Sequence, residues 1–348
     1  MATTYLKYAN FTCLFGTFDL LENSELFQQV VLPAFRTTES RQVDDTFYTL
    51  ANVEIVALND DVEADGVPVL GIAGFLMKAG NEKIGRQYDR NRGYFEDPDA
   101  QIRYQTALFF TLIFNNHRVI YYRPSPKAPT IKTFQTTMRL FLRNSYDSFI
   151  RRLKEEADDA RQLDPESPRV TLKSLRESYP PPHLDVVEMA GEGTLETYVD
   201  RFNVINRARF ELLNSNADLN MDGIHAVRDL KDNTTSNKTV LSHENDTSSG
   251  LKKDAVVKQA DVAAQIGNTK IILTGTDLLG DKLVADNAKF AAKTPLNEEI
   301  LNTRSGARVA YTVFNDEVER GYLSVEDHSA RFADEIRDLR ARLRRGQL

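Results

Sequence analysis

Residues 106–123 read TALFFTLIFNNHRVIYYR, and this stretch decides the fold class. Two runs rich in β-branched and aromatic residues, 108–114 and 119–123, flank the polar sequence NNHR. Runs of this kind, separated by a short polar turn, predict a β-hairpin. We expect Asn115 and Asn116 to form the turn, because asparagine tolerates the left-handed backbone that tight turns need.

Segments of similar composition precede this hairpin and predict further strands. They cover residues 5–18, 46–58 and 67–78, and Gly, Asn, Asp or Pro residues bound each of them. After the hairpin, the sequence PSPKAP over 124–129 interrupts regular structure, and Thr130 can cap a helix. The first part of the chain therefore combines strands with one long helix.

The predicted helix covers residues 130–163 and has one apolar face. The residues of that face recur at helical spacing: Ile131, Phe134, Met138, Phe141, Phe149 and Leu153. An acidic stretch over 155–169 follows the last apolar positions and is typical of an exposed linker. We place a domain boundary there, which gives a β-rich domain over 1–165 with its long helix at 130–160, and a second domain over 166–348.

The second domain mixes strands and helices. We expect strands, or a strand and a turn, at 169–178 and 183–190, followed by a helix at 193–205 and a strand at 207–215. A long polar loop is expected at 229–250. After it we expect a helix at 251–267, ended by Gly267, and a hairpin at 269–287. The fold class is therefore α+β with two domains, each a mainly antiparallel sheet with packed helices.

A charged helix is expected at the C-terminus of this second domain. Ser324 is its expected N-cap, and Asp327 lies three residues further on, close to the capping-box pattern. An apolar stripe follows at Phe332, Ile336, Leu339 and Leu343, with helical spacing. We expect this stripe to provide a contact with a second copy of the chain, which makes a homodimer.

Composition restricts the class of protein. The 348 residues carry a formal net charge of −7 and contain one cysteine, Cys13, within an apolar run. One cysteine allows neither a disulfide framework nor a zinc cage of cysteines, and it fits a reducing cytoplasm. Residues 1–10 do not have the pattern of a signal peptide, and the longest apolar run, 106–114, is too short to span a membrane. We expect a cytoplasmic protein.

Catalytic motifs are absent from the sequence. It contains no phosphate-binding loop, no dinucleotide fingerprint, no nucleophile elbow and no closely spaced histidine pair. We therefore expect no cofactor and favour a protein that is not an enzyme. One alternative is a Mg²⁺-dependent nuclease that uses the acidic cluster Asp60, Asp61, Glu63 and Asp65, although these residues also suit a solvated turn.

Basic side chains gather on three predicted helices. Those that we expect to bind DNA are Lys132, Arg139, Arg143, Arg151, Arg152, Lys154, Lys252, Lys253, Arg337, Arg340, Arg344 and Arg345. Arginine and lysine along helices can neutralise successive phosphates of double-stranded DNA without reading its sequence. The alternative is an ordinary solvated helix face, in which acidic side chains four residues away pair with the basic ones.

The order of these segments resembles the layout of a known family. From residue 100 to residue 345, a hairpin, a Pro/Ser-rich link and a helix precede a strand, a second helix, another hairpin and a charged terminal helix. This order is similar to that of the phage lambda exclusion protein RexA and of related bacterial phage-defence families, among them the Kiwa-system protein KwaB. The resemblance implies a dimeric, two-domain DNA-binding sensor of an abortive-infection system, with a membrane or effector partner protein encoded nearby.

Two other functions stay open from the sequence. The first is the nuclease based on Asp60, Asp61 and Glu63. The second is a scaffold that binds only protein and uses its arginines in salt bridges.

Overall fold

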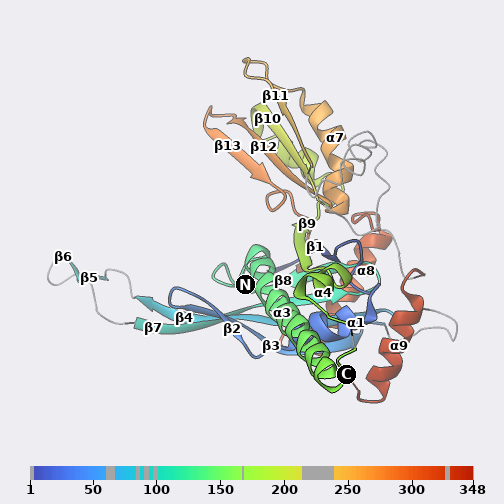
Figure 1. Ribbon diagram of the computed structural model, residues 1–348. Coiled ribbons are helices and arrows are strands. Elements are labelled where there is room, and N and C mark those ends of the chain that lie inside the picture. Colours follow the sequence, from blue (N-terminus) through green and yellow to red (C-terminus); the bar gives the residue numbers. More distant parts are fainter. Residues whose placement is uncertain are drawn as a thin grey trace.

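The computed structural model describes residues 4–59, 67–83, 87–89, 94–96, 101–166, 168–213, 239–325 and 330–347. Its fold is α+β, with two antiparallel sheets and helices packed on them (Figure 1), which confirms the predicted class. The strands β5 (Gln87–Asp89) and β6 (Tyr94–Glu96) pair separately with each other.

The larger sheet has eight strands in the order β14-β1-β8-β7-β4-β3-β2, with β9 also paired to β1. Their bounds are β1 Thr4–Phe15, β2 Ser40–Val43, β3 Thr46–Ala57, β4 Leu70–Lys83, β7 Gln101–Ile113, β8 Arg118–Tyr122, β9 Pro182–Glu188 and β14 Lys293–Leu296. The far parts of β2, β3, β4 and β7 extend away from the helices as an arm (Figure 1).

Helices cover both faces of the larger sheet. One face packs against α1 (Ser24–Leu26), a π-helical turn (Phe27–Val31), α2 (Leu32–Arg36), α3 (Ile131–Leu163) and α9 (Ala333–Arg344). The other face packs against α8 (Thr303–Glu319). The run LFFTLIF is continuously apolar because β7 is buried on both sides: Leu108 and Phe110 face one core, and Phe109 faces the other.

The predicted hairpin is confirmed, with a correction at its turn. β7 and β8 pair antiparallel from Phe109–Tyr122 to Leu112–Val119. We expected Asn115 and Asn116 to be left-handed, but neither has a positive φ. His117 adopts the left-handed conformation instead, with a φ of 54°. The Asn115 side chain instead bridges to the neighbouring loop, because it accepts a hydrogen bond from Leu70 N and donates one to Pro68 O.

The long helix α3 is confirmed almost to the residue. The Thr130 hydroxyl accepts a hydrogen bond from the amide of Thr133 at 3.1 Å and so caps the first turn. The apolar face that includes Phe134, Met138 and Phe141 is buried against the sheet. The opposite side of α3 therefore faces solvent along its length.

The smaller sheet has the order β11-β10-β12-β13. Its strands are β10 Phe202–Leu212, β11 Thr239–Glu244, β12 Thr269–Asp277 and β13 Lys282–Asp286, and its helices are α5 Thr194–Val199 and α7 Lys253–Ile266. α7 lies against one face of this sheet (Figure 1). Phe210 and Ile271 of the sheet belong to the core that α7 helps to bury. Gly267 ends α7 at a φ of 75°, as predicted.

Three sequence-based expectations in the second half differ from the structure. Residues 169–178 contain the short helix α4 (Leu172–Ser178), because Thr171 and Ser174 form a capping box, and not a strand. The helix expected at 193–205 ends at Val199, and β10 follows it. Within the expected loop 229–250, residues 239–244 form β11, while 229–238 lie outside the described residues.

The terminal helix also differs from its prediction. It begins at Ala333 and not at Ser324, and Asp327 lies outside the described residues. Its apolar stripe is used inside the chain, since Phe332, Ile336 and Leu339 are buried against the larger sheet's core. This stripe is therefore not available to a second copy, and the homodimer remains a prediction that needs another surface.

The boundary expected near residue 165 does not separate the two sheets. β9 and β14 follow that residue in the chain, yet both pair with β1. The helices α8 and α9 also pack on the larger sheet. In the part of the chain that the structure describes, no helix combines the length and apolar character needed to cross a membrane.

Candidate nucleic-acid interface

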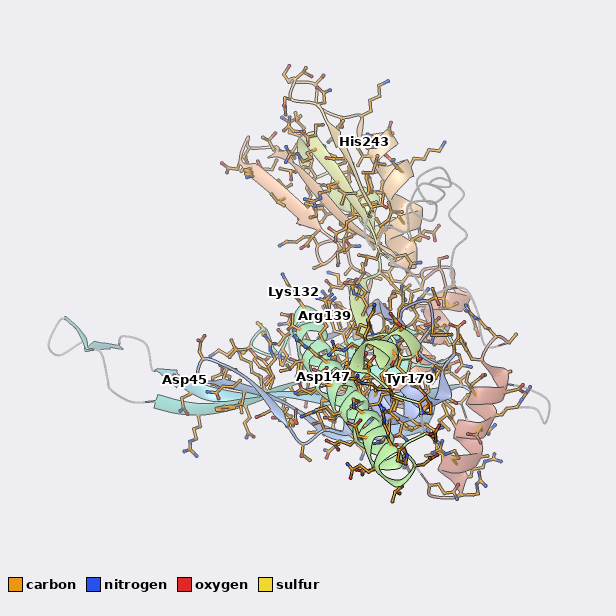
Figure 2. All side chains as sticks on the ribbon, viewed as in Figure 1. Asp45, Lys132, Arg139, Asp147, Tyr179 and His243 are labelled. Carbon is orange, nitrogen blue, oxygen red and sulfur yellow. The ribbon has the colours of Figure 1, made fainter. Side chains whose placement is uncertain are left out.

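A cleft of about 430 Å³ lies where the solvent side of α3 meets α4 and β9. Its lining is Arg139, Leu142, Arg143, Tyr146, Asp147, Arg176, Pro181, Pro182, His183 and Leu184. Figure 2 shows Arg139 and Asp147 one after the other along α3, with Lys132 nearer the start of the helix. Three guanidinium groups and an imidazole thus line a cleft with an apolar floor.

The carboxylate of Asp185, on β9, binds two side chains of the cleft lining, Arg139 and His183. Its Oδ1 accepts hydrogen bonds from Arg139 Nη2 at 2.8 Å, Lys270 Nζ at 2.9 Å and Gln135 Nε2 at 3.0 Å. Its Oδ2 lies 2.9 Å from His183 Nε2. Because Lys270 belongs to β12 and Arg139 to α3, Asp185 joins the smaller sheet to the larger one.

This environment sets the pKa of Asp185. Burial alone would raise that pKa, since only 5% of the side chain is exposed. The hydrogen bonds from His183 and Lys270 and their positive charges oppose burial and lower the pKa to about 2. Asp185 is therefore ionised at neutral pH and fixes the positions of its cationic partners.

The six predicted basic residues of α3 differ in their surroundings. Arg139 is held by Asp185 and by Leu184 O, at 2.7 Å. Arg143 is 79% exposed, and its Nε lies 3.9 Å from Asp147. Among the described residues, no carboxylate lies within ion-pair distance of Lys132. Lys132, Arg139 and Arg143 lie on the same solvent-facing side of α3.

The other three lie further along α3 and have local partners. Arg151 donates to Asp147 O and Ser148 Oγ, Arg152 pairs with Gln29 and Glu156, and Lys154 pairs with Asp158. The Arg152–Glu156 and Lys154–Asp158 contacts are the i,i+4 pairs of an ordinary solvated helix, whereas the contact with Gln29 joins α3 to the π-helical turn.

The remaining predicted basic residues lie on two separate helices. Lys252 is exposed at the start of α7, and the Lys253 ammonium donates to Phe202 O. On α9, Arg337 pairs with Asp334 at 3.2 Å, and Arg340, Arg344 and Arg345 lie on or near the last turns. The twelve residues therefore do not form one continuous stripe; α3 alone brings a subset of them to a cleft.

Sequence reasoning missed four basic residues that the fold brings to α3. Arg41, on β2, donates to Thr136 Oγ1 at 2.8 Å and stacks on Tyr48. Arg176 and His183 line the cleft from α4 and β9, and Lys270 on β12 donates to Asp185, which also binds Arg139. None of them belongs to a basic run, so only tertiary packing assembles them.

The acidic cluster of the nuclease alternative, Asp60, Asp61, Glu63 and Asp65, lies outside the described residues. Within the described ranges, no group of three or more His, Cys, Asp or Glu side chains could hold a metal ion. Cys13 is buried, and burial raises the pKa of its thiol well above the usual range.

No protein-family model and no curated protein matches this chain.

Proposed function

We propose that this chain binds double-stranded DNA, largely without sequence specificity, through the surface formed by Arg41, Lys132, Arg139, Arg143, Arg176 and His183, here called the α3 face. The observation that carries the proposal is the cleft between α3, α4 and β9, in which Arg139, Arg143 and Arg176 converge. Guanidinium groups are the side chains best suited to bind phosphate oxygens in pairs.

The cations of the α3 face are accessible to a ligand. The ion pair between Arg143 and Asp147 is long and exposed, so it contributes little and a phosphate can replace it. Among the described residues, neither Lys132 nor Arg176 has a carboxylate within ion-pair distance. Because Lys132 and Arg143 are eleven residues apart on one helix, they are separated by roughly 16 Å, enough to contact several phosphates.

The overall charge of −7 limits where DNA can bind. An acidic surface repels the duplex, while short-range attraction depends on the local distribution of charge, because salt screens beyond about 10 Å. The α3 face brings Lys132, Arg143 and Arg176 together beside a cleft, so binding there is expected to be confined and sensitive to salt.

The setting of this activity is taken from the layout of the sequence alone. That layout supports an anti-phage sensor of the RexA-like type, with a membrane or effector partner protein. The nuclease alternative needs residues outside the described ranges and is not proposed.

Fluorescence anisotropy with a labelled duplex tests the DNA proposal. We expect Lys132→Glu and Arg143→Glu each to weaken binding equally for unrelated sequences and to reduce the slope of log K against log salt by about 1. Arg344→Glu on α9 carries the same charge change away from the α3 face, and it should leave affinity almost unchanged.

Two results would overturn the proposal. One is the absence of binding by the parent chain at low salt. The other is an equal loss of affinity for Arg344→Glu and Arg143→Glu, which would mean that only total charge matters.

A further inference from the structure

The turn between β12 and β13 presents two leucines to solvent. Leu278 is 73% exposed and Leu279 is 88% exposed. The turn is nevertheless well ordered by hydrogen bonds: Asp277 Oδ1 accepts from Leu279 N and from Asp281 N, both at 2.9 Å. Covering these two leucines with an apolar surface would remove them from water and so lower the free energy.

Acidic side chains flank these leucines. Asp277 precedes them and Asp281 follows, and Lys282 begins β13. A surface that fits this turn should therefore be apolar at its centre and basic around its rim.

The cleft of the α3 face has this chemistry. Its floor is apolar, from Leu142, Tyr146, Pro182 and Leu184. Arg143 and Arg176 stand at its rim, while Asp147 is the one carboxylate in its lining. The floor accepts leucine side chains, and the rim attracts the two aspartates.

The turn cannot enter the cleft of its own chain. Lys270, near the start of β12, donates to Asp185, which also binds Arg139 of that cleft. Leu278 follows eight residues later along a straight strand, which places the turn roughly 26 Å from Lys270. A Leu278–Leu279 turn that enters the cleft must therefore come from another molecule.

We propose that two copies of this chain form a dimer in which the Leu278–Leu279 turn of each copy docks in the α3–α4–β9 cleft of the other. The same pair of surfaces is used twice, as a two-fold symmetric dimer requires. Charge complementarity between Asp277 and Asp281 on one copy and Arg143 and Arg176 on the other selects this occupant.

The docked turn covers part of the surface that we propose for DNA. Arg143 and Arg176 would face the partner's aspartates and could not hold phosphates at the same time. This competition rests on the proposed function, whereas the docking itself does not.

Sedimentation velocity of the full chain across a concentration series, without nucleic acid, tests the docking. We expect the Leu278→Asp/Leu279→Asp variant to raise the dissociation constant of the dimer by about 100-fold or more, because both apolar contacts are lost. Leu163→Asp/Leu301→Asp is the matched control, since these leucines are 89% and 83% exposed elsewhere. The control should dimerise like the parent.

A charge exchange identifies the partner surface. Arg176→Glu alone and Asp281→Arg alone should each weaken the dimer, and the variant with both changes should recover at least part of the lost affinity. A parent chain that stays monomeric at every concentration overturns the inference, as does a Leu278→Asp/Leu279→Asp variant that dimerises like the parent. Because DNA is absent, neither result depends on the proposed function.

Discussion

Asp185 shows how one buried side chain determines the geometry of the candidate site. Three donors converge on its Oδ1, from the side chains of Gln135, Arg139 and Lys270. Arg139 is thereby aimed along the cleft and lies close to Lys270 of the smaller sheet. The Asp185 carboxylate holds Arg139 and Lys270 in position. We therefore expect its removal to lower mainly the stability of the folded protein.

Asp185→Asn should lower the free energy of unfolding at neutral pH by about 1–3 kcal/mol, because it removes the charge that satisfies several buried hydrogen bonds. The expected loss of stability is smaller than for breaking a fully buried ion pair, because Arg139 and Lys270 remain partly exposed. Urea denaturation of the two proteins measures the difference. Asp147→Asn is the control, because that carboxylate is exposed and should cost less than about 0.5 kcal/mol.

The difference in unfolding free energy between the parent and Asp185→Asn should become smaller as the pH falls. The folded-state pKa of Asp185 is about 2, below the value of about 3.9 in an unfolded chain. Its stabilising contribution is therefore complete above about pH 4 and is lost as the pH falls toward 2. A difference between the parent and Asp185→Asn that stays constant down to pH 2 would contradict this assignment.

Some helices and strands of the fold are much easier to predict from the sequence than others. The apolar runs of β1 and β7 and the periodic face of α3 are strong signals, because these segments contribute large side chains to one or two cores. The helix α8 was not predicted. Its buried side includes Gly306, Ala307 and Ala310, whose small side chains give little periodic contrast.

The candidate site was only partly predictable for a related reason. Arg139 and Arg143 lie on a helix with a clear pattern, so their shared ridge follows from spacing. Arg176, His183 and Lys270 come from three other elements, and no local pattern indicates that they meet. The terminal helix was misjudged because its stripe does not say which surface covers it.

The packing of α9 gives a prediction at this scale. Ile336 is fully buried between α9 and the larger sheet's core, so Ile336→Ala should lower the free energy of unfolding by about 2–4 kcal/mol. Chemical denaturation measures this loss, and sedimentation should show that the folded variant keeps the parent's oligomeric state. A variant of unchanged stability that fails to dimerise would instead support the original interpretation of this stripe as a contact between copies.

At the scale of the whole molecule, the two proposals make the α3 face a shared surface. The proposed dimer would hide Arg143 and Arg176, which the proposed DNA binding requires. Under these two proposals the molecule would have a resting state in which it covers its own binding surface, and the concentration of DNA would decide between the states.

Adding an unlabelled short duplex should therefore convert dimers to DNA-bound monomers, which multi-angle light scattering can measure from the protein mass. The Leu278→Asp/Leu279→Asp variant should bind the same duplex more tightly than the parent, because no docked turn has to leave first. If the duplex instead binds the dimer without changing its protein mass, the two ligands do not compete for one surface.

The position of β1 has a consequence for how the protein is made. Thr4–Phe15 is synthesised long before two of its three neighbours, because β8 is residues 118–122 but β9 and β14 are residues 182–188 and 293–296. The hydrogen bond from Thr4 to Leu296 spans 292 residues. Contacts this distant in the chain slow folding and leave apolar strands open to aggregation until they close. During translation β1 cannot complete its pairing until β14 has been made, and a nascent-chain chaperone is expected to raise the yield of the folded protein.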